Sequence, residues 1–443
     1  MKARFIILVL CGLLALPAAR AAMPEIQHWT TASGTRVYFV ATSVLPIVDL
    51  SLVFDAGAAR DGNKSGLAAL TSRLLTDGTA ELDAGAIARR FERYGARVAT
   101  DNSRDTARLT VRSLSASENL QPTLDHLIEV LSNPTFPAAA LERRRAQALV
   151  GLRQAQQNPG RVAERAFAQA LFGDHPYANL SQGNISGVQA VTRDDVQAFH
   201  DRYYVAANAI IAIVGDLQRP QAESIATRLA QALKPGSAAP ALPPVPDLKR
   251  AKIVRRSFDS SQTHILIGAP AISRTNSHYI PLYVANHVLG GSGLVSVLAD
   301  EMRAQRGLSY STSSTLITAA QRGWFELASS VRNDKLDESL QVLRNILQRY
   351  AASGPSRQRL EAAKRNITGS FPLRLDSNQD ILAHIVMIGF YGLPLDYLQT
   401  FPKRVEAVSQ PQTRQAFQAH VDPSHMVTVL VGPKAVIGDV STD

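Results

Sequence analysis

Residues 66–79 read Gly-Leu-Ala-Ala-Leu-Thr-Ser-Arg-Leu-Leu-Thr-Asp-Gly-Thr, and this segment says most about how the chain folds. Leu67, Leu70 and Leu74 recur at the three- and four-residue spacing that puts side chains on one face of an α-helix. The helix is predicted to begin after residues 61–65 and to stop near Gly78, because glycine commonly ends helices. Taken alone, the segment is an amphipathic helix whose leucines pack on a core.

Strands and helices are mixed irregularly on both sides of this helix. Alternating apolar and polar residues predict strands, and apolar residues at helical spacing predict helices. In the first half we expect strands at 35–40, 48–54, 97–100, 107–113 and 209–214, with helices at 83–94, 118–131, 138–157, 162–171 and 193–203. In the second half we expect strands at 263–268, 308–317 and 323–331, with helices at 279–289, 294–306, 336–350 and 356–368.

The end of the first half is repeated at the end of the second. Residues 191–199 lead to Ile213-Val214-Gly215, and residues 408–417 lead to Leu430-Val431-Gly432, an offset of about 217 residues. Residues 234–246 hold five prolines in 13 positions, which indicates an extended linker. The fold class is therefore α+β, with two duplicated domains of about 200 residues, each a mostly antiparallel sheet packed with helices. The predicted boundaries are 1–22, 23–233, 234–250 and 251–443.

The first 22 residues have the pattern of a secretory signal peptide. Lys2 and Arg4 precede an apolar run from Phe5 to Leu16, and small residues follow up to Ala22. The apolar run is too short to span a bilayer, and no second long apolar run follows, so we expect no membrane span. The single cysteine, Cys11, lies inside this segment. Export without disulfides favours the periplasm of a bacterium.

The composition excludes some functions and leaves others open. A hydrophobic content of 45% with 19% charged residues is typical of a globular protein. The net charge is +10, and its densest run is Arg143-Arg144-Arg145. That run is either the solvated face of a helix or a surface for an anionic partner, a membrane surface or acidic peptide. The chain shows no interleaved aromatics, so we expect no nucleic-acid binding.

The order and spacing of several short motifs together resemble a known family. They are Phe54-Asp55-Ala56-Gly57-Ala58, Gly66-Leu67-Ala68, Leu75-Thr76-Asp77-Gly78-Thr79, Tyr94-Gly95-Ala96, Leu131-Ser132-Asn133-Pro134-Thr135-Phe136, Asn158-Pro159, Tyr203-Tyr204 with Asn208, Val214-Gly215-Asp216 and Arg306-Gly307-Leu308-Ser309-Tyr310-Ser311. Across essentially the whole mature chain, the sequence resembles the pitrilysin/insulinase (M16) zinc peptidases. It is most similar to the two-domain branch that includes the mitochondrial processing peptidase subunits.

The resemblance implies a zinc site whose residues this chain has lost. In the family the first helix carries H-x-x-E-H, in which two histidines bind zinc and the glutamate activates water. Ala69, Ser72 and Arg73 stand at those positions. Alanine has no donor atom, serine is a poor general base, and arginine is permanently cationic. The third ligand of the family, a glutamate, falls at Gly151 or close to it.

No other metal or nucleophile site replaces the lost one. Residues 143–163 contain no acidic residue, so the loss of the third ligand does not depend on the register. Among the ten histidines only His420 and His425 are close in sequence, a spacing that a structural role explains better than a metal. No G-x-S-x-G motif or phosphate loop occurs. We expect no metal or other cofactor in this chain, and zinc in a partner subunit.

The second half contains an arginine and a tyrosine to which the resemblance assigns a function. Family members carry an arginine and a tyrosine seven residues apart, which face the zinc and bind the substrate backbone and the developing oxyanion. Arg303 and Tyr310 have that spacing, whereas Arg306 does not. A guanidinium and a phenol are suitable donors to a tetrahedral intermediate. The structural alternative is a surface arginine at a helix end and a tyrosine packed in a strand.

Three functional hypotheses follow. The first is a non-catalytic subunit of a heteromeric periplasmic zinc metallopeptidase, which lends Arg303 and Tyr310 to a partner carrying H-x-x-E-H and encloses unfolded peptide with it. The second is a non-enzymatic scaffold or peptide-binding protein on the same fold. The third, an active zinc peptidase with unusual ligands, has the least support in the sequence.

Overall fold

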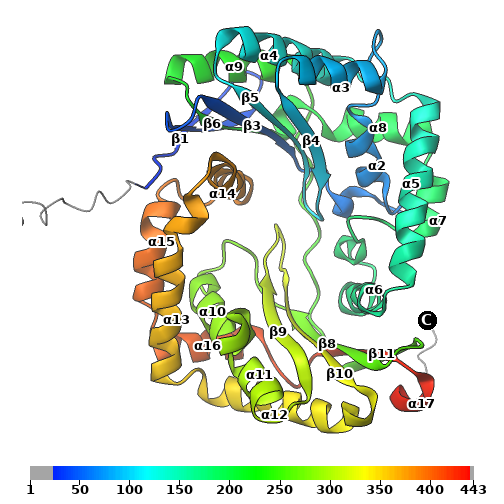
Figure 1. Ribbon diagram of the computed structural model, residues 1–443, viewed down its shortest axis with the longest axis vertical. Coiled ribbons are helices and arrows are strands. Elements are labelled where there is room, and N and C mark those ends of the chain that lie inside the picture. Colours follow the sequence, from blue (N-terminus) through cyan, green and yellow to red (C-terminus); the bar gives the residue numbers. More distant parts are fainter. Residues whose placement is uncertain (1–22, 440–443) are drawn as a thin grey trace, which may run out of the picture.

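The computed structural model describes residues 23–439, which form two β-sheets at opposite ends of the molecule, with helices around and between them (Figure 1). The first sheet has the strand order β1-β2-β6-β3-β5-β4, and the second has β7-β11-β8-β10-β9. The strands are β1 (Gln27–Thr30), β2 (Arg36–Ala41), β3 (Ile47–Phe54), β4 (Arg97–Asn102), β5 (Ala107–Leu114), β6 (Ala209–Gly215), β7 (Lys252–Ser257), β8 (Gln262–Pro270), β9 (Ser309–Ile317), β10 (Trp324–Arg332) and β11 (Val427–Gly432).

The two sheets share one topology, which confirms the predicted duplication. Leaving out β1, the strands correspond one to one in order, and each sheet has a single parallel pair, β2 with β6 and β7 with β11. The remaining neighbours in each sheet are antiparallel. The predicted repeat of the last strand is also present, because β6 ends at Gly215 and β11 at Gly432. The predicted α+β class is therefore confirmed.

Most of the helices form in the segments where the apolar spacing predicts them. The first half contains α2 (Leu67–Leu74), α3 (Ala84–Arg93), α4 (Ser117–Ser132), α5 (Ala138–Gln156), α6 (Pro159–Phe172), α7 (Ile185–Ala190), α8 (Arg193–Tyr203) and α9 (Arg219–Ala232). The second half contains α10 (Tyr279–Asn286), α11 (Val297–Ala299), α12 (Leu336–Ser353), α13 (Arg357–Ser370), α14 (Asn378–Tyr391), α15 (Tyr397–Glu406), α16 (Gln410–His420) and α17 (Lys434–Ile437). Helices α7, α9, α14, α15, α16 and α17 were not expected from the sequence.

Two sequence expectations are wrong in detail, and both errors involve a close glycine contact. Helix α2 ends at Leu74, and Gly78 bridges to Asp83 instead of capping the helix. A Cβ at Gly78 would lie 2.6 Å from Pro137 Cγ, so close packing explains this glycine. The predicted helix 294–306 is broken into 3₁₀, α and π turns. The preceding π-turn, η4 (His287–Gly291), packs against β9, where a Cβ at Gly290 would lie 2.3 Å from Ser314 N.

Each half places one helix on the sheet of the other half. Helix α6 packs on β7, β8 and β11, and helix α14 packs on β2, β3 and β6 (Figure 1). The contacts are tight, because a Cβ at Gly268 would lie 2.7 Å from Phe167 Cζ. At the equivalent place a Cβ at Gly389 would lie 2.6 Å from Tyr38 Cε2. The two cores are thus interlocked, and burial of both helix faces stabilises the arrangement.

The segment between the halves is extended and fastened at several points. Residues 236–248 form neither helix nor strand, as the five prolines predict. Val245 is buried, and the carbonyl of Pro243 lies 2.9 Å from His175 Nε2. The domain boundaries given above stay a prediction. The predicted signal peptide, residues 1–22, lies outside the described residues. Within residues 23–439, no helix has the length and apolar character to cross a membrane.

Asp105 fastens the first half to the second. It lies in the turn between β4 and β5, and its side chain accepts hydrogen bonds from the hydroxyl of Tyr177 at 2.7 Å and from the backbone N–H of Ala320 at 2.9 Å. The hydroxyl of Tyr391, at the end of α14, donates a third bond at 3.3 Å. Ala320 and Tyr391 belong to the second half. Burial raises the pKa of Asp105, and these donors oppose that rise.

We predict that Asp105→Ala lowers the free energy of unfolding by about 2 to 4 kcal/mol, because it leaves buried donors from both halves without an acceptor. The measurement is urea unfolding followed by circular dichroism. The matched control is Asp101→Ala, an exposed residue of the preceding strand, which should change stability by less than about 0.5 kcal/mol. Equal effects of the two substitutions would contradict the assignment.

Candidate functional site

The helix at the degenerate zinc positions is fixed by a buried carboxylate. Asp61 accepts hydrogen bonds from the backbone N–H of Gly66 and of Ala68, each at 2.7 Å, at the start of α2. Such bonds satisfy N–H groups that the first turn of a helix leaves without partners. Burial raises the pKa of Asp61 to about 7, and the two N–H donors oppose this. Gly66 has a φ of 108°, a backbone conformation that favours glycine.

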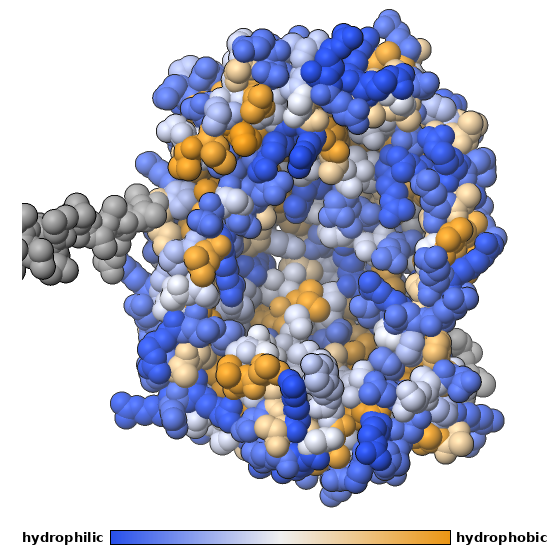
Figure 2. Space-filling model, viewed as in Figure 1, coloured by the Kyte–Doolittle hydropathy of each residue, from blue (hydrophilic) through white to orange (hydrophobic). Residues whose placement is uncertain are grey.

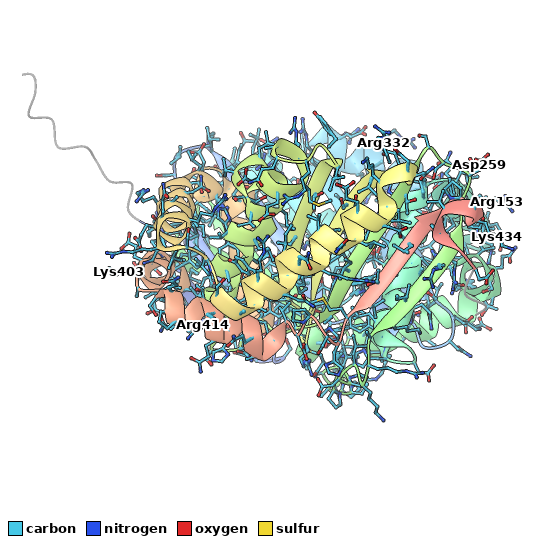
Figure 3. The ribbon with its side chains drawn as sticks, turned by 90° about the horizontal axis from the view of Figure 1, so that it is seen from below. Arg153, Asp259, Arg332, Lys403, Arg414 and Lys434 are labelled. Carbon is cyan, nitrogen blue, oxygen red and sulfur yellow. The ribbon has the colours of Figure 1, made fainter. Side chains whose placement is uncertain are left out.

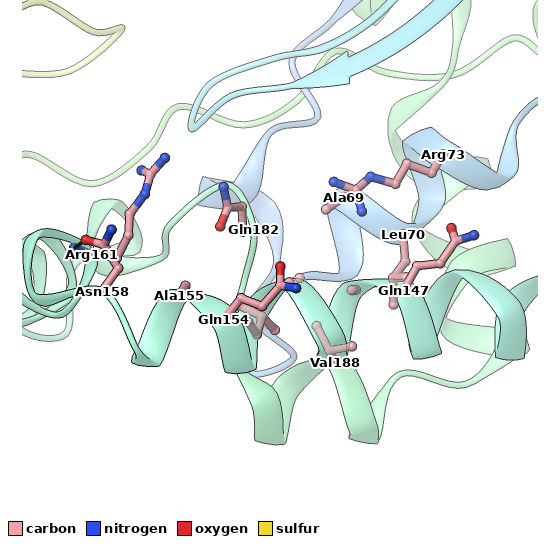
Figure 4. Close-up of a pocket in the computed structure, with 14 residues that line it drawn as sticks. Ala69, Leu70, Arg73, Gln147, Gln154, Ala155, Asn158, Arg161, Gln182 and Val188 are labelled. Carbon is pink, nitrogen blue, oxygen red and sulfur yellow. Dashed lines mark hydrogen bonds between the residues drawn. The ribbon is translucent and has the colours of Figure 1, made fainter.

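Three of the four degenerate zinc positions meet in one pocket. Ala69 and Arg73 on α2 face Gly151 on α5 across a pocket of about 380 Å³ (Figure 4). The remaining lining residues are Gly66, Leu70, Gln147, Ala148, Leu152, Gln154, Ala155, Asn158, Arg161, Gln182 and Val188. Ser72 does not line it. Its side chain is buried and its hydroxyl donates a hydrogen bond to the carbonyl of Asp101 on β4, at 3.3 Å.

The donor atoms of this pocket do not fit zinc. Its lining supplies two guanidinium groups and four side-chain amides, but no imidazole, carboxylate or thiolate, which are the groups that bind zinc. Arg73 adds a fixed positive charge at one former ligand position. Lack of space for a ligand side chain at Gly151 is not what prevents zinc binding, because a Cβ built there meets no atom within 4 Å. Within residues 23–439, no group of three or more His, Cys, Asp or Glu side chains could hold a metal ion.

A loop closes one side of the pocket and brings in a residue that the sequence did not single out. Gln182 lies in the loop before α7 and lines the pocket. Gly183 approaches α2 so closely that a Cβ would lie 2.5 Å from Gly66 Cα. Asn102 on β4 donates to the carbonyl of Ser181 at 2.8 Å, and this bond also holds the loop. Gln182 cannot be found from local sequence, because only this tertiary contact places it.

A second pocket continues the first toward the other half. It measures about 290 Å³ and shares Asn158 and Arg161 with the first pocket. Its far wall belongs to the second sheet and includes Ser311 and Ser313 on β9 and Glu326 on β10. Burial raises the pKa of Glu326, whose carboxylate accepts a hydrogen bond from the indole N–H of Trp324 at 3.1 Å. The two pockets adjoin at Asn158 and Arg161, and we refer to them together as the groove; the surface is hollowed between the halves (Figure 2).

The structure brings Arg303 and Tyr310 together. Arg303 lies in a π-turn, η6 (Asp300–Ala304), and Tyr310 lies at the start of β9. The guanidinium carbon of Arg303 is 4.5 Å from the centre of the Tyr310 ring, and Tyr310 is 80% exposed. Arg306 instead pairs with Glu301 at 3.0 Å. Arg303 and Tyr310 line neither pocket, but Ser311 and Ser313 on the same strand do.

The histidines that are close in sequence do not form a common site. His420 Nε2 lies 3.0 Å from Nδ1 of His278, a residue that the sequence gave no reason to pair with it. His425 Nδ1 lies 2.7 Å from the carboxylate of Asp422. Asp422 has a pKa lowered to about 2, chiefly by its hydrogen bond with His425. Both histidines have structural partners, as the sequence interpretation expected.

Two models of protein families match this chain. The profile described as "Insulinase (Peptidase family M16)" matches residues 36–182, and the profile described as "Peptidase M16 inactive domain" matches residues 190–367. This chain belongs to peptidase family M16. The resemblance found in the sequence is thereby confirmed.

Relatives of this M16 chain include proteins described as inactive. A crystal structure titled as a peptidase M16 inactive domain from Pseudomonas fluorescens is 36% identical, with a TM-score of 0.89, over 92% of this chain and 98% of that one. A "Non-peptidase homolog YmxG" of Helicobacter pylori is 26% identical over 97% of this chain and 99% of its own length. An uncharacterized zinc protease of Mycobacterium bovis is 26% identical over 83% of this chain and 84% of its own.

We predict that Ala69→His, Arg73→His and Gly151→Glu together create a zinc site in this M16 chain. The three positions face one pocket, and the space beyond Gly151 is open. The triple variant should retain about one Zn²⁺ per chain after gel filtration, measured by mass spectrometry of the metal, because three protein ligands suffice for a stable site. The control variant carries the same two histidines with Gly151→Gln in place of Gly151→Glu, and it should retain much less Zn²⁺. Equal retention would contradict the geometry.

Proposed function

We propose that this protein is the non-catalytic subunit of a heteromeric M16 peptidase. It would act in the periplasm with a partner that carries H-x-x-E-H and zinc. The observation that carries the proposal is the groove that joins the degenerate zinc pocket to β9, the strand of Tyr310. The zinc chemistry has been lost at one end of this groove. The Arg303–Tyr310 pair is kept, and Tyr310 lies on the strand whose Ser311 and Ser313 line the second pocket.

The groove supports binding of an extended peptide. Strands β4 and β9 are the last strands of their sheets, so each has one edge without a strand neighbour. Such an edge presents backbone N–H and C=O groups that an extended peptide can pair with. Residues of β4 alternate between exposed and half-buried, so this strand is accessible along its length. An unfolded segment lying between the sheets would therefore find backbone partners in both halves.

The state of Arg303 supports its use in a shared active site. Among the described residues it has no ion-pair partner, and its planar guanidinium lies beside the exposed ring of Tyr310. Both groups can therefore donate hydrogen bonds to another molecule. In a water-excluded site each donor to a developing oxyanion contributes a few kcal/mol to catalysis. A complex with the zinc-bearing partner would provide that exclusion of water.

The assay that tests the proposal compares three samples. They are this chain alone, its H-x-x-E-H partner alone, and their mixture, each given an unfolded peptide and each analysed for zinc. Hydrolysis by the mixture well above that of either chain supports the proposal. Zinc-dependent hydrolysis by this chain alone overturns it. Assembly with no gain in hydrolysis favours the alternative, a scaffold or peptide-binding protein.

We predict that Arg303→Ala or Tyr310→Phe lowers kcat of the mixture by about 100- to 1,000-fold, the range seen when one oxyanion donor is removed. Assembly, measured by analytical ultracentrifugation, should be unchanged. The matched control is Arg306→Ala, which removes an arginine from the same segment that is already paired with Glu301. If the control lowers kcat as much as Arg303→Ala, the assigned role of Arg303 is wrong.

A further inference from the structure

We propose that the pocket at the former zinc site is itself a binding site for a carboxylate group of a peptide. The ligand chemistry is a single carboxylate, from an aspartate or glutamate side chain or from a chain terminus. The proposal rests on the proposed function only for the idea that peptide enters the groove. The pocket itself belongs to this chain and needs neither zinc nor partner.

Arg73 is the group that makes this pocket attractive to an anion. It is exposed, and within residues 23–439 its side chain has no hydrogen-bond or ion-pair partner. Figure 4 shows its side chain running back along α2, with the guanidinium beside Ala69 at the pocket. A planar guanidinium offers paired donors that match the two oxygens of a carboxylate. The small side chain of Ala69 leaves that approach open.

Arg161, the other arginine that lines the pocket, already has an acidic partner. Arg161 donates to Glu164 at 2.8 Å, and Arg144 on α5 donates to Asp77 at 2.7 Å through two nitrogens. Among the residues that line the pocket, Arg73 is therefore the cation whose charge is not already neutralised by a protein carboxylate. One uncompensated positive charge suits a ligand group with one negative charge.

The rest of the lining adds hydrogen bonds without repulsion. Gln154 on α5 and Gln182 on the loop before α7 both line the pocket, and neither side chain has a hydrogen-bond partner among the described residues. Their amide N–H groups can donate to a carboxylate that Arg73 holds. None of the 14 lining residues is acidic, so nothing in the pocket opposes an anion. A site built for Zn²⁺ has thus become a site for a negative group.

The test measures peptide binding to the isolated full-length mature chain. Three peptides of one otherwise identical sequence, each labelled with the same uncharged dye without a carboxylate, are compared by fluorescence anisotropy at low salt. The first has a central glutamate and an amidated C-terminus. The second has glutamine there and a free C-terminal carboxylate. The third has glutamine and an amidated C-terminus, so it has no carboxylate.

We expect at least one carboxylate peptide to bind about tenfold more tightly than the neutral peptide, with the preference falling as salt rises. Arg73→Gln should abolish the preference. The matched control is Arg153→Gln, an exposed arginine of α5 that lies at the periphery of the molecule and does not line the pocket (Figure 3). That variant should keep the preference. Because Arg73 is exposed, its substitution should leave the fold intact, which circular dichroism checks.

The pattern of the three peptides identifies the source of the carboxylate. If the first peptide binds more tightly than the neutral peptide, the bound group is a side-chain carboxylate. If the second does, the bound group is the C-terminal carboxylate. If both do, the pocket accepts either source. Equal binding of all three peptides, or a preference that survives Arg73→Gln, overturns the proposal. Neither result bears on Arg303 and Tyr310, whose role is judged by kcat of the mixture, so failure of one proposal is distinguishable from failure of the other.

Discussion

The exchange of helices between the two halves is the constraint on which the rest of the structure depends. Helix α6 leaves its own sheet and covers the second one, while α14 covers the first. Each helix buries apolar side chains against the sheet of the other half, so the two halves share their cores. Asp105 adds polar bonds across the same boundary. The halves therefore hold one another at a fixed distance.

This constraint also builds the groove. Helix α6 begins at Pro159, and the side chain of Asn158 caps it by accepting the backbone N–H of Arg161 at 3.1 Å. The same two residues, Asn158 and Arg161, line both pockets. The helix that locks the halves together thus joins the degenerate zinc pocket to β9. A peptide bound along this path would contact both halves, because the second pocket is lined by α6 and by strands of the second sheet.

The pocket carries a positive group, as a zinc site would, but the chemistry of that group is different. A divalent cation would hold a substrate oxygen by coordination, whereas Arg73 offers a fixed positive charge and directional hydrogen bonds. The pocket therefore remains suited to electron-rich groups, but it has no group that could activate water. This division agrees with family membership, in which profiles and relatives described as inactive match this chain.

The sequence by itself determined the α+β class and the duplication, because each follows from local spacing or from motifs in order. It placed Ala69, Arg73 and Gly151 at one site, and the structure brings them together. Only the tertiary structure decided the exchange of α6 and α14, the position of Gln182 and the turning of Ser72 toward β4. Those features arise from contacts such as Gly183 on Gly66. Residues more than a hundred positions apart meet there, and no local pattern records which distant surface a side chain will touch.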